Sequence, residues 1–397
     1  MSKPLDGIRV LDFSHALAGP YCTMLLAAYG AEVYKVEGID SVDMGRIWGP
    51  PFQGGEASYF LGLNSGKHSL SIDLKRPEGL ALCHRLLEKS DVFIENLRPG
   101  AMSRLGLGWE KARQINPRLV YCSISGYGQN GPSRDEAAMD LILQASCGLI
   151  SVTGTPDGRV ARCGHSVADI TSGMFALIGI LMALRVREQT GAGQFVDIAM
   201  LDSMISAMAS NFANYFGTGV DPKPMGTAFT TIVPYATYPT RDREVAIAAA
   251  SEKLWQGFCD AVGHTEWADD PRFAANHLRV ANRGVLEPMI VETLQAHAAD
   301  VWVEVFRKHG VPCTPVRTLA EVANDAQAAA RNMFPTLAHT EAGEIRVTGV
   351  PIKFSETPGN VEFAAPTLGR HTRESLRTLL GVSDAELDTM TAAGIIK

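Results

Sequence analysis

The chain of 397 residues is 46% hydrophobic and 20% charged, with a net charge of -7. This is the composition of a globular protein with room for one large hydrophobic core and a second, smaller one. The acidic balance excludes a broad basic surface for nucleic acid, so a phosphate-bearing ligand must be bound by local Lys and Arg side chains. The longest apolar stretch, 174–184, is too short to span a bilayer, and no signal-peptide pattern is visible. We therefore expect a cytoplasmic protein without a membrane partner.

The first 130 residues alternate between strand-like and helix-like segments. Several strand candidates are runs of apolar residues, as expected for strands covered on both faces. Repeated strand and helix units predict an α/β fold with a doubly wound parallel sheet. The strand candidates are 8–13, 32–37, 69–74, 92–96 and 119–125. The helix candidates include 21–29, 77–89 and 109–115.

The pattern becomes helical between 135 and about 216, and its clearest long helix is 170–188. Around Asp221-Pro-Lys-Pro224 the sequence turns into a Pro-broken loop, which we interpret as a domain linker. Residues 234–330 then have the pattern of a small α+β unit. The tail has a predicted strand pair around 345–354, followed by a helical region.

Cations and Gly-rich turns follow the ends of several predicted strands. In an open parallel sheet, ligands bind outside the carboxyl ends of the strands. Each cation alone is more typical of solvated surface, but for the whole set a ligand with phosphates is an equally good interpretation. The segments are 14–20 after the first strand, 75–76 after the third, 96–100 with Arg104 after the fourth, and 126–131 after the fifth. The G-x-G-x-x-G string at 126–131 follows the fifth strand rather than the first, so we discount it as a dinucleotide fingerprint.

The second informative segment is 164–173, just before the long helix. Asp169 is placed to be the N-cap of that helix, and capping alone would explain an Asp there. The same geometry would keep its carboxylate ionised in a partly dry site, where it can act as a nucleophile toward a thioester. Gly164 and Gly173 leave room for a carbonyl and its developing oxyanion. Asp140 and Gln144 are four residues apart on one helix face, as in a polar stripe or a site. No His and Cys cluster has metal spacing, so no metal is expected.

Many ordered segments carry a resemblance to one family, and together they span nearly the whole chain. They are Leu5–Phe13, Ala18–Pro20, Gly30–Glu37, Asn64–Lys67, Glu95–Gly100, Ser125–Gly128, Ala168–Asp169, Thr190–Gln194 and Leu368–Thr372. Through these segments the chain resembles the class III CoA-transferases, the family of carnitine CoA-transferase and the bile-acid-inducible proteins.

The resemblance implies a large Rossmann-like domain built from both chain ends, 1–220 and 335–397, with a smaller α+β domain, 221–334, inserted between them. It implies that two ring-like subunits interlock as a homodimer. It also implies that Asp169 is the catalytic nucleophile, with a coenzyme A thioester as substrate and no permanently bound cofactor. The positions that match those used near CoA are His15, Ala18, Lys75, Asn96, Arg104 and Tyr127.

Departures from the family pattern bear on the choice of reaction. Met139-Asp140 stands where the racemases carry a His–Asp pair, so a two-base proton exchange lacks one base. A 2-methylacyl-CoA racemase that uses Asp169 and Asp140 is the alternative, and a CoA-binding protein without turnover is the second. Leu17 replaces a Gln of the formyl-CoA:oxalate transferases, and Gly38 replaces an Arg common near the adenine, so oxalate is disfavoured as the acceptor.

The stretches 226–235 and 276–280 are similar to members that use succinyl-CoA and dicarboxylates of four to six carbons. A dicarboxylate needs a cation for its remote end. Arg46 is the candidate for that role, and Asp140 is a further candidate on the substrate side. The sequence therefore predicts transfer of CoA between carboxylic acids, with succinyl-CoA as the expected donor.

Overall fold

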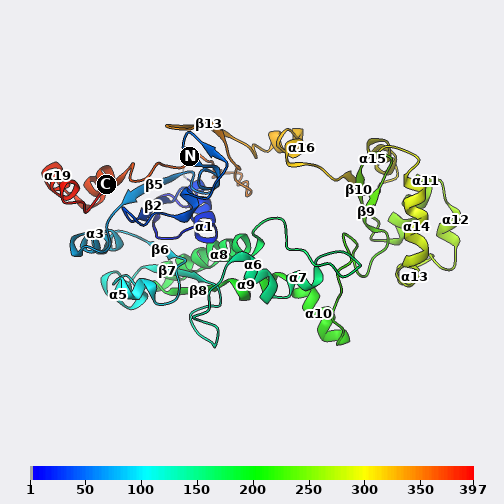
Figure 1. The fold of residues 1–397 in the computed structure, drawn as a ribbon, viewed down its shortest axis with the longest axis horizontal. Helices are drawn as coiled ribbons and strands as arrows, with labels where there is room; N and C mark the ends of the chain where they lie inside the picture. Colours follow the sequence, from blue (N-terminus) through cyan, green and yellow to red (C-terminus); the bar gives the residue numbers. More distant parts are fainter. Residues whose placement is uncertain (1–2) are drawn as a thin grey trace. The chain divides into compact units, whose positions relative to one another are not determined.

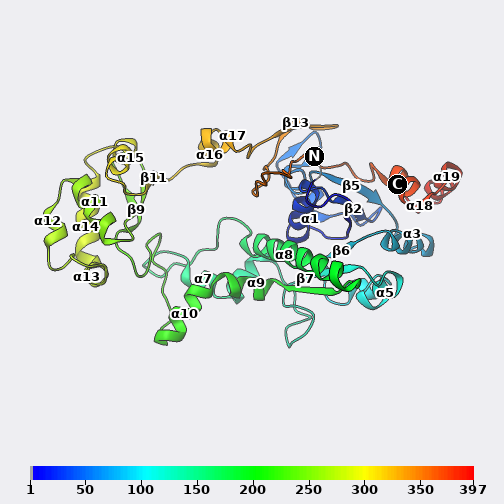
Figure 2. The same ribbon diagram turned by 180° about the vertical axis from the view of Figure 1, so that it is seen from behind.

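A computed structural model describes residues 3–397, which divide into two compact units (Figures 1 and 2). The first unit consists of the chain up to Leu149, Cys163–Val220 and Ala326–Lys397. The second consists of Ile150–Arg162 and Asp221–Asp325. These units differ from the expected domain ranges at two segments, 150–162 and 326–334, and the functional domain boundaries stay a prediction.

The first unit is built on a six-stranded sheet in the order β5-β2-β1-β6-β7-β8. All neighbouring strands run parallel, which confirms the expected α/β fold with a parallel sheet. Numbered within the sheet in chain order, the arrangement is 3-2-1-4-5-6, that of a Rossmann fold. The strands are β1 (Arg9–Asp12), β2 (Glu32–Glu37), β5 (Lys67–Ser71), β6 (Val92–Glu95), β7 (Val120–Ser125) and β8 (Phe195–Ala199).

Helices cover both faces of this sheet, because side chains alternate along each strand. Leu11, Tyr34 and Leu70 point to one face and pack with α3 (Pro77–Glu88), α5 (Trp109–Ile115) and α18 (Thr372–Leu380). The opposite face carries α1 (Ala18–Ala28) and α8 (Val167–Thr190), which lie against each other. Helix α1 begins three residues before the expected start, because Pro20 falls in its first turn, where no N–H donor is needed.

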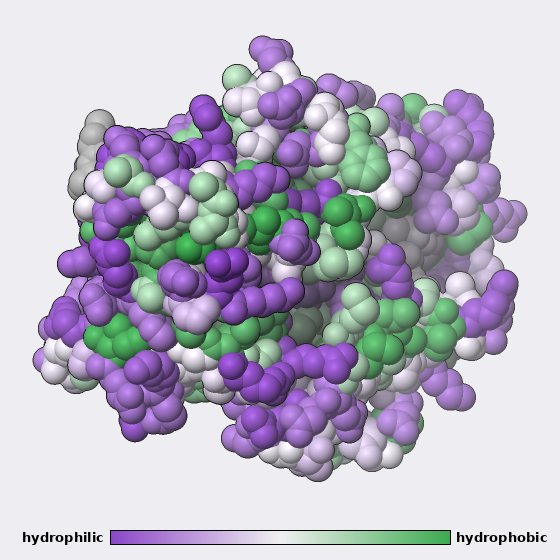
Figure 3. All heavy atoms as spheres, turned by 60° about the vertical axis from the view of Figure 1, so that its left-hand side comes forward, coloured by the Kyte–Doolittle hydropathy of each residue, from purple (hydrophilic) through white to green (hydrophobic). Residues whose placement is uncertain are grey.

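Helix α8 extends beyond the expected helix 170–188 at both ends and contains the apolar stretch at 174–184. By length and composition alone its 24 residues are a candidate membrane span, and half of the apolar window is buried inside the molecule. It packs on α1, α9 (Met200–Ala207), β7 and β8, as a core helix does. On the face of the molecule seen in Figure 3, hydrophilic side chains separate the apolar ones into small groups.

The end of the chain closes the edge of the sheet. The N–H of Lys397 donates to the Ser71 carbonyl at 3.1 Å, and the N–H of Asp73 donates to the Ile395 carbonyl at 2.9 Å. The expected strand pair around 345–354 lies earlier, as the hairpin β12 (Thr336–His339) and β13 (Gly343–Arg346). Further elements are η1 (Met44–Arg46), β3 (Phe52–Gln53), β4 (Glu56–Ala57), α2 (Ser58–Leu61), α4 (Ala101–Arg104), α6 (Asp140–Ser146), α10 (Ala209–Thr218), α17 (Ala326–Ala330) and α19 (Asp384–Ala392).

The second unit has its own core beneath a three-stranded antiparallel sheet in the order β11-β10-β9. Its strands are β9 (Tyr235–Pro239), β10 (Glu244–Ala248) and β11 (Cys313–Pro315). Its helices are α7 (Leu149–Val152), which overlaps the boundary, α11 (Glu252–Val262), α12 (Glu266–Asp269), α13 (Asn276–Ala281), α14 (Arg283–Leu294), α15 (Ala299–Lys308) and α16 (Leu319–Ala323).

Candidate active site

The strand order reverses between β1 and β6, and the segments that leave these two strands meet there. The side chain of Asn96, just after β6, accepts a hydrogen bond from the His15 N–H at 2.7 Å and donates to the His15 carbonyl at 2.8 Å. In open α/β sheets the crevice at such a switch point is the usual ligand site. His15 and Asn96, both expected near CoA, are therefore brought together by the topology.

A cavity of about 200 Å³ opens at this edge of the sheet, lined by residues that follow β1, β2, β5 and β6. Its charged lining is Lys75, Asp40 and Asp73, and His15 lines it together with apolar side chains such as Leu97 and Leu105. Burial, with the charge of Lys35, lowers the pKa of His15, so its ring is neutral near pH 7. A slot that combines apolar side chains, a neutral imidazole and a lysine suits a planar base with nearby phosphates.

Two guanidinium groups converge beside this edge. A Cβ built on Gly100 would lie 3.2 Å from Nη1 of Arg104 and 3.9 Å from Nη2 of Arg134. Among residues 3–397, no ion pair of 4.0 Å or less engages either arginine or Lys75. Arg134 was missed by the sequence analysis, because it follows a Gly-Pro turn and nothing in its spacing marks it. The two guanidinium groups therefore add positive charge beside Gly100, in the segment that follows β6.

Tyr127 follows β7 on the same edge. Its hydroxyl lies 3.5 Å from the Ser146 hydroxyl on α6. The loop that carries it is fixed by Gln129, whose N–H donates to Asp197 at 3.0 Å. The structure thus places Tyr127 on the carboxyl side of the sheet, one strand farther from the switch point than Asn96.

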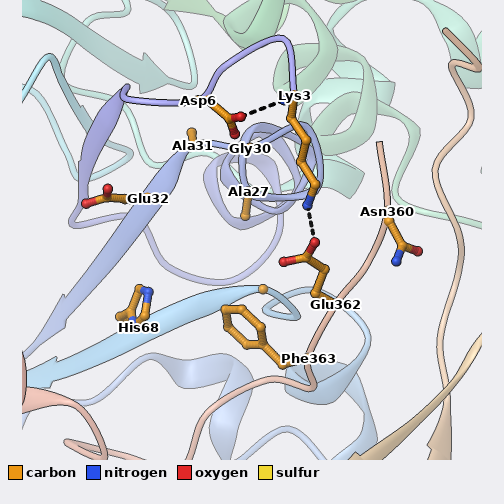
Figure 4. A pocket seen from close by; sticks show the side chains of 11 residues that line it. Lys3, Asp6, Ala27, Gly30, Ala31, Glu32, His68, Asn360, Glu362 and Phe363 are labelled. Atoms are coloured by element: carbon orange, nitrogen blue, oxygen red, sulfur yellow. Dashed lines mark hydrogen bonds and ion pairs between the residues drawn. The ribbon is translucent and has the colours of Figure 1, made fainter. Parts of the chain in front are cut away.

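A larger cavity, of about 340 Å³, lies at the opposite edge of the sheet, where β2 and β5 begin (Figure 4). Its charged lining is mostly acidic, with Asp6, Glu32 and Glu362. Its lysine, Lys3, is already paired with Glu362 at 2.6 Å. Since the amino ends of parallel strands are not where such folds bind substrates, we place the candidate site at the other edge.

Asp169 is the third residue of α8, not its N-cap, which corrects the sequence prediction. The N-cap is Ser166, and its side chain makes no capping bond. Asp140 supplies the capping contact instead, because its Oδ1 accepts a hydrogen bond from the Ala168 N–H at 2.9 Å. Its Oδ2 accepts from Gln144 at 2.7 Å. The start of α8 is thus capped by Asp140, and the carboxyl group of Asp169 is not needed as a cap.

The protonation of Asp169 also differs from the prediction. Burial, together with the nearby negative charge of Asp140, raises the pKa of Asp169 to about 7. A hydrogen bond from the backbone of Ala18 opposes this shift. We expected the helix terminus to keep the carboxylate ionised, and that expectation was wrong because desolvation and the second carboxylate outweigh the helix end. The group is poised between its two protonation states near neutral pH.

A close approach of two helices sets Asp169 next to the start of α1. A Cβ at Gly173, one turn after Asp169, would lie only 2.6 Å from the Ala18 carbonyl oxygen, so only glycine allows this contact. Gly173 therefore matters for helix packing rather than for open space around a substrate. The packing brings the backbone of Ala18 to the carboxyl group.

Tyr59 belongs to this neighbourhood and was missed by the sequence analysis. Burial raises the pKa of its hydroxyl, and the charges of Asp169, Asp43 and Asp140 add to the shift. The hydroxyl therefore stays protonated and can act as a hydrogen-bond donor. Its segment, around Phe60, is typical of an apolar core, so the sequence gives no signal for it.

Arg46 does not fit the role predicted for it. It is 9% exposed and donates to both carboxylate oxygens of Glu37, at 2.8 and 2.7 Å. It also donates to the Pro366 carbonyl at 3.2 Å and stacks over the Phe60 ring at 3.7 Å. Because its charge is already satisfied inside the protein, we withdraw it as the partner of a substrate carboxylate.

The sheet order, with a cavity at the switch point, is that of an α/β protein of the Rossmann type. A family model described as CoA-transferase family III matches residues 5–372. The chain therefore belongs to this family and is an enzyme of this class, with a CoA thioester as substrate. This confirms the resemblance found in the sequence.

Individual relatives match over nearly their full lengths. The chain is 36% identical over 395 residues to "Succinyl-CoA:glutarate CoA-transferase" of Mus musculus, covering 100% of this chain and 91% of that protein. It is 38% identical to "Succinate--glutarate CoA-transferase" of Agrobacterium fabrum, covering 95% and 96%. A crystal structure of a CAIB/BAIF family protein from Brucella suis is 36% identical, with a TM-score of 0.86 and coverage of 96% and 100%.

Proposed function

We propose that the enzyme transfers CoA from succinyl-CoA to a free dicarboxylate of four to six carbons, through Asp169. The observation that carries this proposal is a half-buried carboxyl group with a raised pKa, next to a backbone donor. A carboxylate of raised basicity is a stronger nucleophile than an ordinary one when it ionises. The named activities of the two glutarate-specific relatives support the choice of donor and acceptor.

The proposed reaction has four steps. A carboxylate oxygen of Asp169 attacks the thioester carbonyl carbon, the C–S bond breaks, and CoA leaves as thiolate with a mixed anhydride formed. The thiolate then attacks the aspartyl carbonyl, which releases succinate and leaves an aspartyl-CoA thioester. The acceptor carboxylate attacks that thioester, forming a second anhydride and freeing the thiolate again. Attack of the thiolate on the acceptor carbonyl yields the new acyl-CoA and restores Asp169.

Neighbouring groups have separate proposed tasks. The Ala18 N–H and the protonated Tyr59 hydroxyl are donors for charge that develops on the carbonyl oxygens. Arg104 and Arg134 would hold phosphates of CoA, and Lys75, which lines the cavity, would add a further positive charge. His15, Asn96 and Tyr127 would contact CoA along the same edge of the sheet, as the family resemblance implies.

The contacts of Asp140 favour transfer over racemisation. Both its oxygens already accept hydrogen bonds, from Ala168 and Gln144. A carboxylate held in this way supports the start of α8 and is poorly placed to take a proton from a substrate carbon. Deuterium uptake from heavy water at the α-carbon of 2-methylacyl-CoA would favour the racemase instead.

We propose a cytoplasmic homodimer, interlocked as in the resembling family. Support comes from an exposed apolar row on α8 at four-residue spacing. It consists of Met174, Ile178, Met182 and Val186, which are 42%, 44%, 64% and 40% exposed in the single chain. A row of this kind on a core helix is typical of a surface covered by another subunit.

The test of this mechanism is the detection of a covalent intermediate at Asp169. Wild type is incubated with succinyl-CoA alone, treated with borohydride, and digested for peptide mass analysis. Reduction of an aspartyl thioester converts that residue to homoserine, and we expect the change at Asp169 only. Transfer to glutarate is followed in parallel by chromatography of the CoA esters. Transfer by Asp169→Ala at the wild-type rate would show that the mechanism is wrong.

A further inference from the structure

The turn that joins β1 to α1 holds a strained residue. Ala16 has a backbone φ of +63°, in the left-handed region that residues other than glycine rarely adopt. Such a conformation is energetically unfavourable and persists only where the surroundings fix it. Two residues later the chain reaches Ala18, whose backbone faces Asp169.

Buried side chains hold this turn by its backbone. Oδ1 of Asp43 accepts a hydrogen bond from the Ala16 N–H at 2.8 Å. The ammonium of Lys35 donates to the Ser14 carbonyl at 2.6 Å. Lys35 and Asp43 are joined to each other by an ion pair at 2.8 Å, with both side chains 0% exposed. The two charges therefore form one clamp on either side of His15.

A second buried ion pair, between β5 and β1, contacts the backbone of the same turn. Nζ of Lys67 lies 3.2 Å from Asp12, and both side chains are 0% exposed. Asp12 accepts a hydrogen bond from the Ser14 N–H at 2.8 Å. Three parallel strands, β1, β2 and β5, thus each send a charged side chain to the α1 side of the sheet, beneath one turn.

Stability alone does not account for these charges. Taking an ion pair out of water carries a large desolvation penalty, and apolar side chains of similar size often stabilise a core as well or better. Unlike apolar side chains, the clamp forms hydrogen bonds with the backbone of the strained turn. Lys35 is the donor to the Ser14 carbonyl, and Asp43 is the acceptor for the Ala16 N–H.

We propose that Lys35 and Asp43 are positioning residues, which hold the turn at 14–18 so that the Ala18 N–H faces the reacting carboxyl group of Asp169. This inference rests on the proposed function and adds a task for charges that never reach the substrate. It also accounts for the segments Gly30–Glu37 and Asn64–Lys67, which contain Lys35 and Lys67 but supply no residue to the proposed reaction.

The experiment measures how fast the covalent adduct forms at saturating succinyl-CoA, by rapid quench and intact mass, with KM determined alongside. Asp43→Ala removes the acceptor for the Ala16 N–H. Asp43→Asn keeps an oxygen there and is the conservative partner. Asp43→Ala combined with Ala16→Gly tests rescue, because glycine adopts a positive φ without a steric penalty. Arg187→Met is the control, since it breaks a buried pair with Asp91 (2.8 Å) at the far end of α8.

We expect Asp43→Ala to slow adduct formation by roughly tenfold or more with a smaller change in KM, because small misplacements at a reacting centre cost that much. Asp43→Asn should keep most of the rate, and the added Ala16→Gly change should restore part of it. Arg187→Met should lose thermal stability but keep the wild-type rate. A wild-type rate in Asp43→Ala, or equal losses in both Asp43 variants without rescue, overturns the inference.

A variant that disturbs no buried charge covers the case in which Asp43→Ala does not fold. Ala16→Val places a β-branched side chain at a positive φ, so it strains the turn while the clamp stays intact. It should also slow adduct formation, and a wild-type rate there would refute the positioning role. Failure of the proposed function is distinguishable, since wild type would then form no adduct at Asp169 at all.

Discussion

Replacement of Asp169 by Asn should abolish transfer and at the same time stabilise the enzyme in mildly alkaline solution. The reason is the raised pKa of the carboxyl group, about 7 in the folded chain against about 3.9 in an unfolded one. Between these two values the folded state binds more protons than the unfolded state. Stability therefore falls as the pH rises from about 4 to about 7, and the full penalty is present above pH 7.

The size of the effect follows from the shift. Three pKa units correspond to about 4 kcal/mol if the group were wholly shielded. Asp169 is half-buried rather than enclosed, so solvent screening reduces this to about 1–2 kcal/mol. Asn has the same shape and carries no charge at any pH, so Asp169→Asn removes the penalty. The expected gain in Tm at pH 8 is about 2–4 °C for a unit of this size.

The assay is thermal unfolding of wild type and Asp169→Asn at pH 5 and pH 8, without CoA esters. The difference between the two proteins should be small at pH 5 and should reach its full value at pH 8. Asp221→Asn, at an exposed position in the linker, controls for the general loss of one negative charge. The same stability difference at both pH values would show that the carboxyl group of Asp169 has an ordinary pKa in the folded protein.

Three further predictions test the neighbouring groups. The rate of adduct formation with succinyl-CoA should rise with pH, with a midpoint at about 7, as Asp169 ionises. Asp140→Asn should move this midpoint to lower pH, because it removes a nearby negative charge. An unchanged midpoint would show that the charge of Asp140 does not affect the pKa of Asp169. Arg104→Gln and Arg134→Gln should each raise KM for succinyl-CoA several-fold with little change in kcat. Arg76→Gln, at an exposed cation outside the cavity, should leave KM unchanged. Equal KM values for the three variants would show that Arg104 and Arg134 do not bind the phosphates of CoA. Met182→Glu, on the exposed row of α8, should convert the proposed dimer to monomer in light scattering, while Val220→Glu, at an exposed apolar residue off that row, should leave its mass unchanged.

The sequence predicted the parallel sheet because its strands are apolar runs, which is what burial on both faces requires. It also predicted which loops share an edge, since the carboxyl ends of parallel strands coincide. That reasoning was enough to bring His15, Asn96 and Lys75 to one region. The predicted start of α1 was three residues late, because Gly19-Pro20 is typical of a turn. Proline is also common in the first turn of a helix, which is where Pro20 lies.

The errors at the site concern partners that are distant in the chain. Asp169 was expected to be an ionised cap, and its spacing gives no hint that Asp140, 29 positions earlier, takes over the capping contact. Arg46 was expected to face a substrate, yet Glu37 satisfies its charge inside the protein. A residue type limits what a group can do, but the pKa of a carboxyl group or the availability of a cation depends on neighbours that only the fold brings together.

Burial raises the pKa of Asp169 to about 7, so in the proposed mechanism the fraction of enzyme that is protonated at neutral pH cannot attack the thioester. The same burial protects the proposed intermediates, because an aspartyl anhydride exposed to water would hydrolyse and the CoA bond energy would be lost. A carboxylate in open solvent would be ionised at all times but would not shield the anhydride. The raised pKa is therefore the consequence of a site that must exclude water, and the Ala18 donor, fixed by the clamped turn, compensates part of the lost solvation where the negative charge appears.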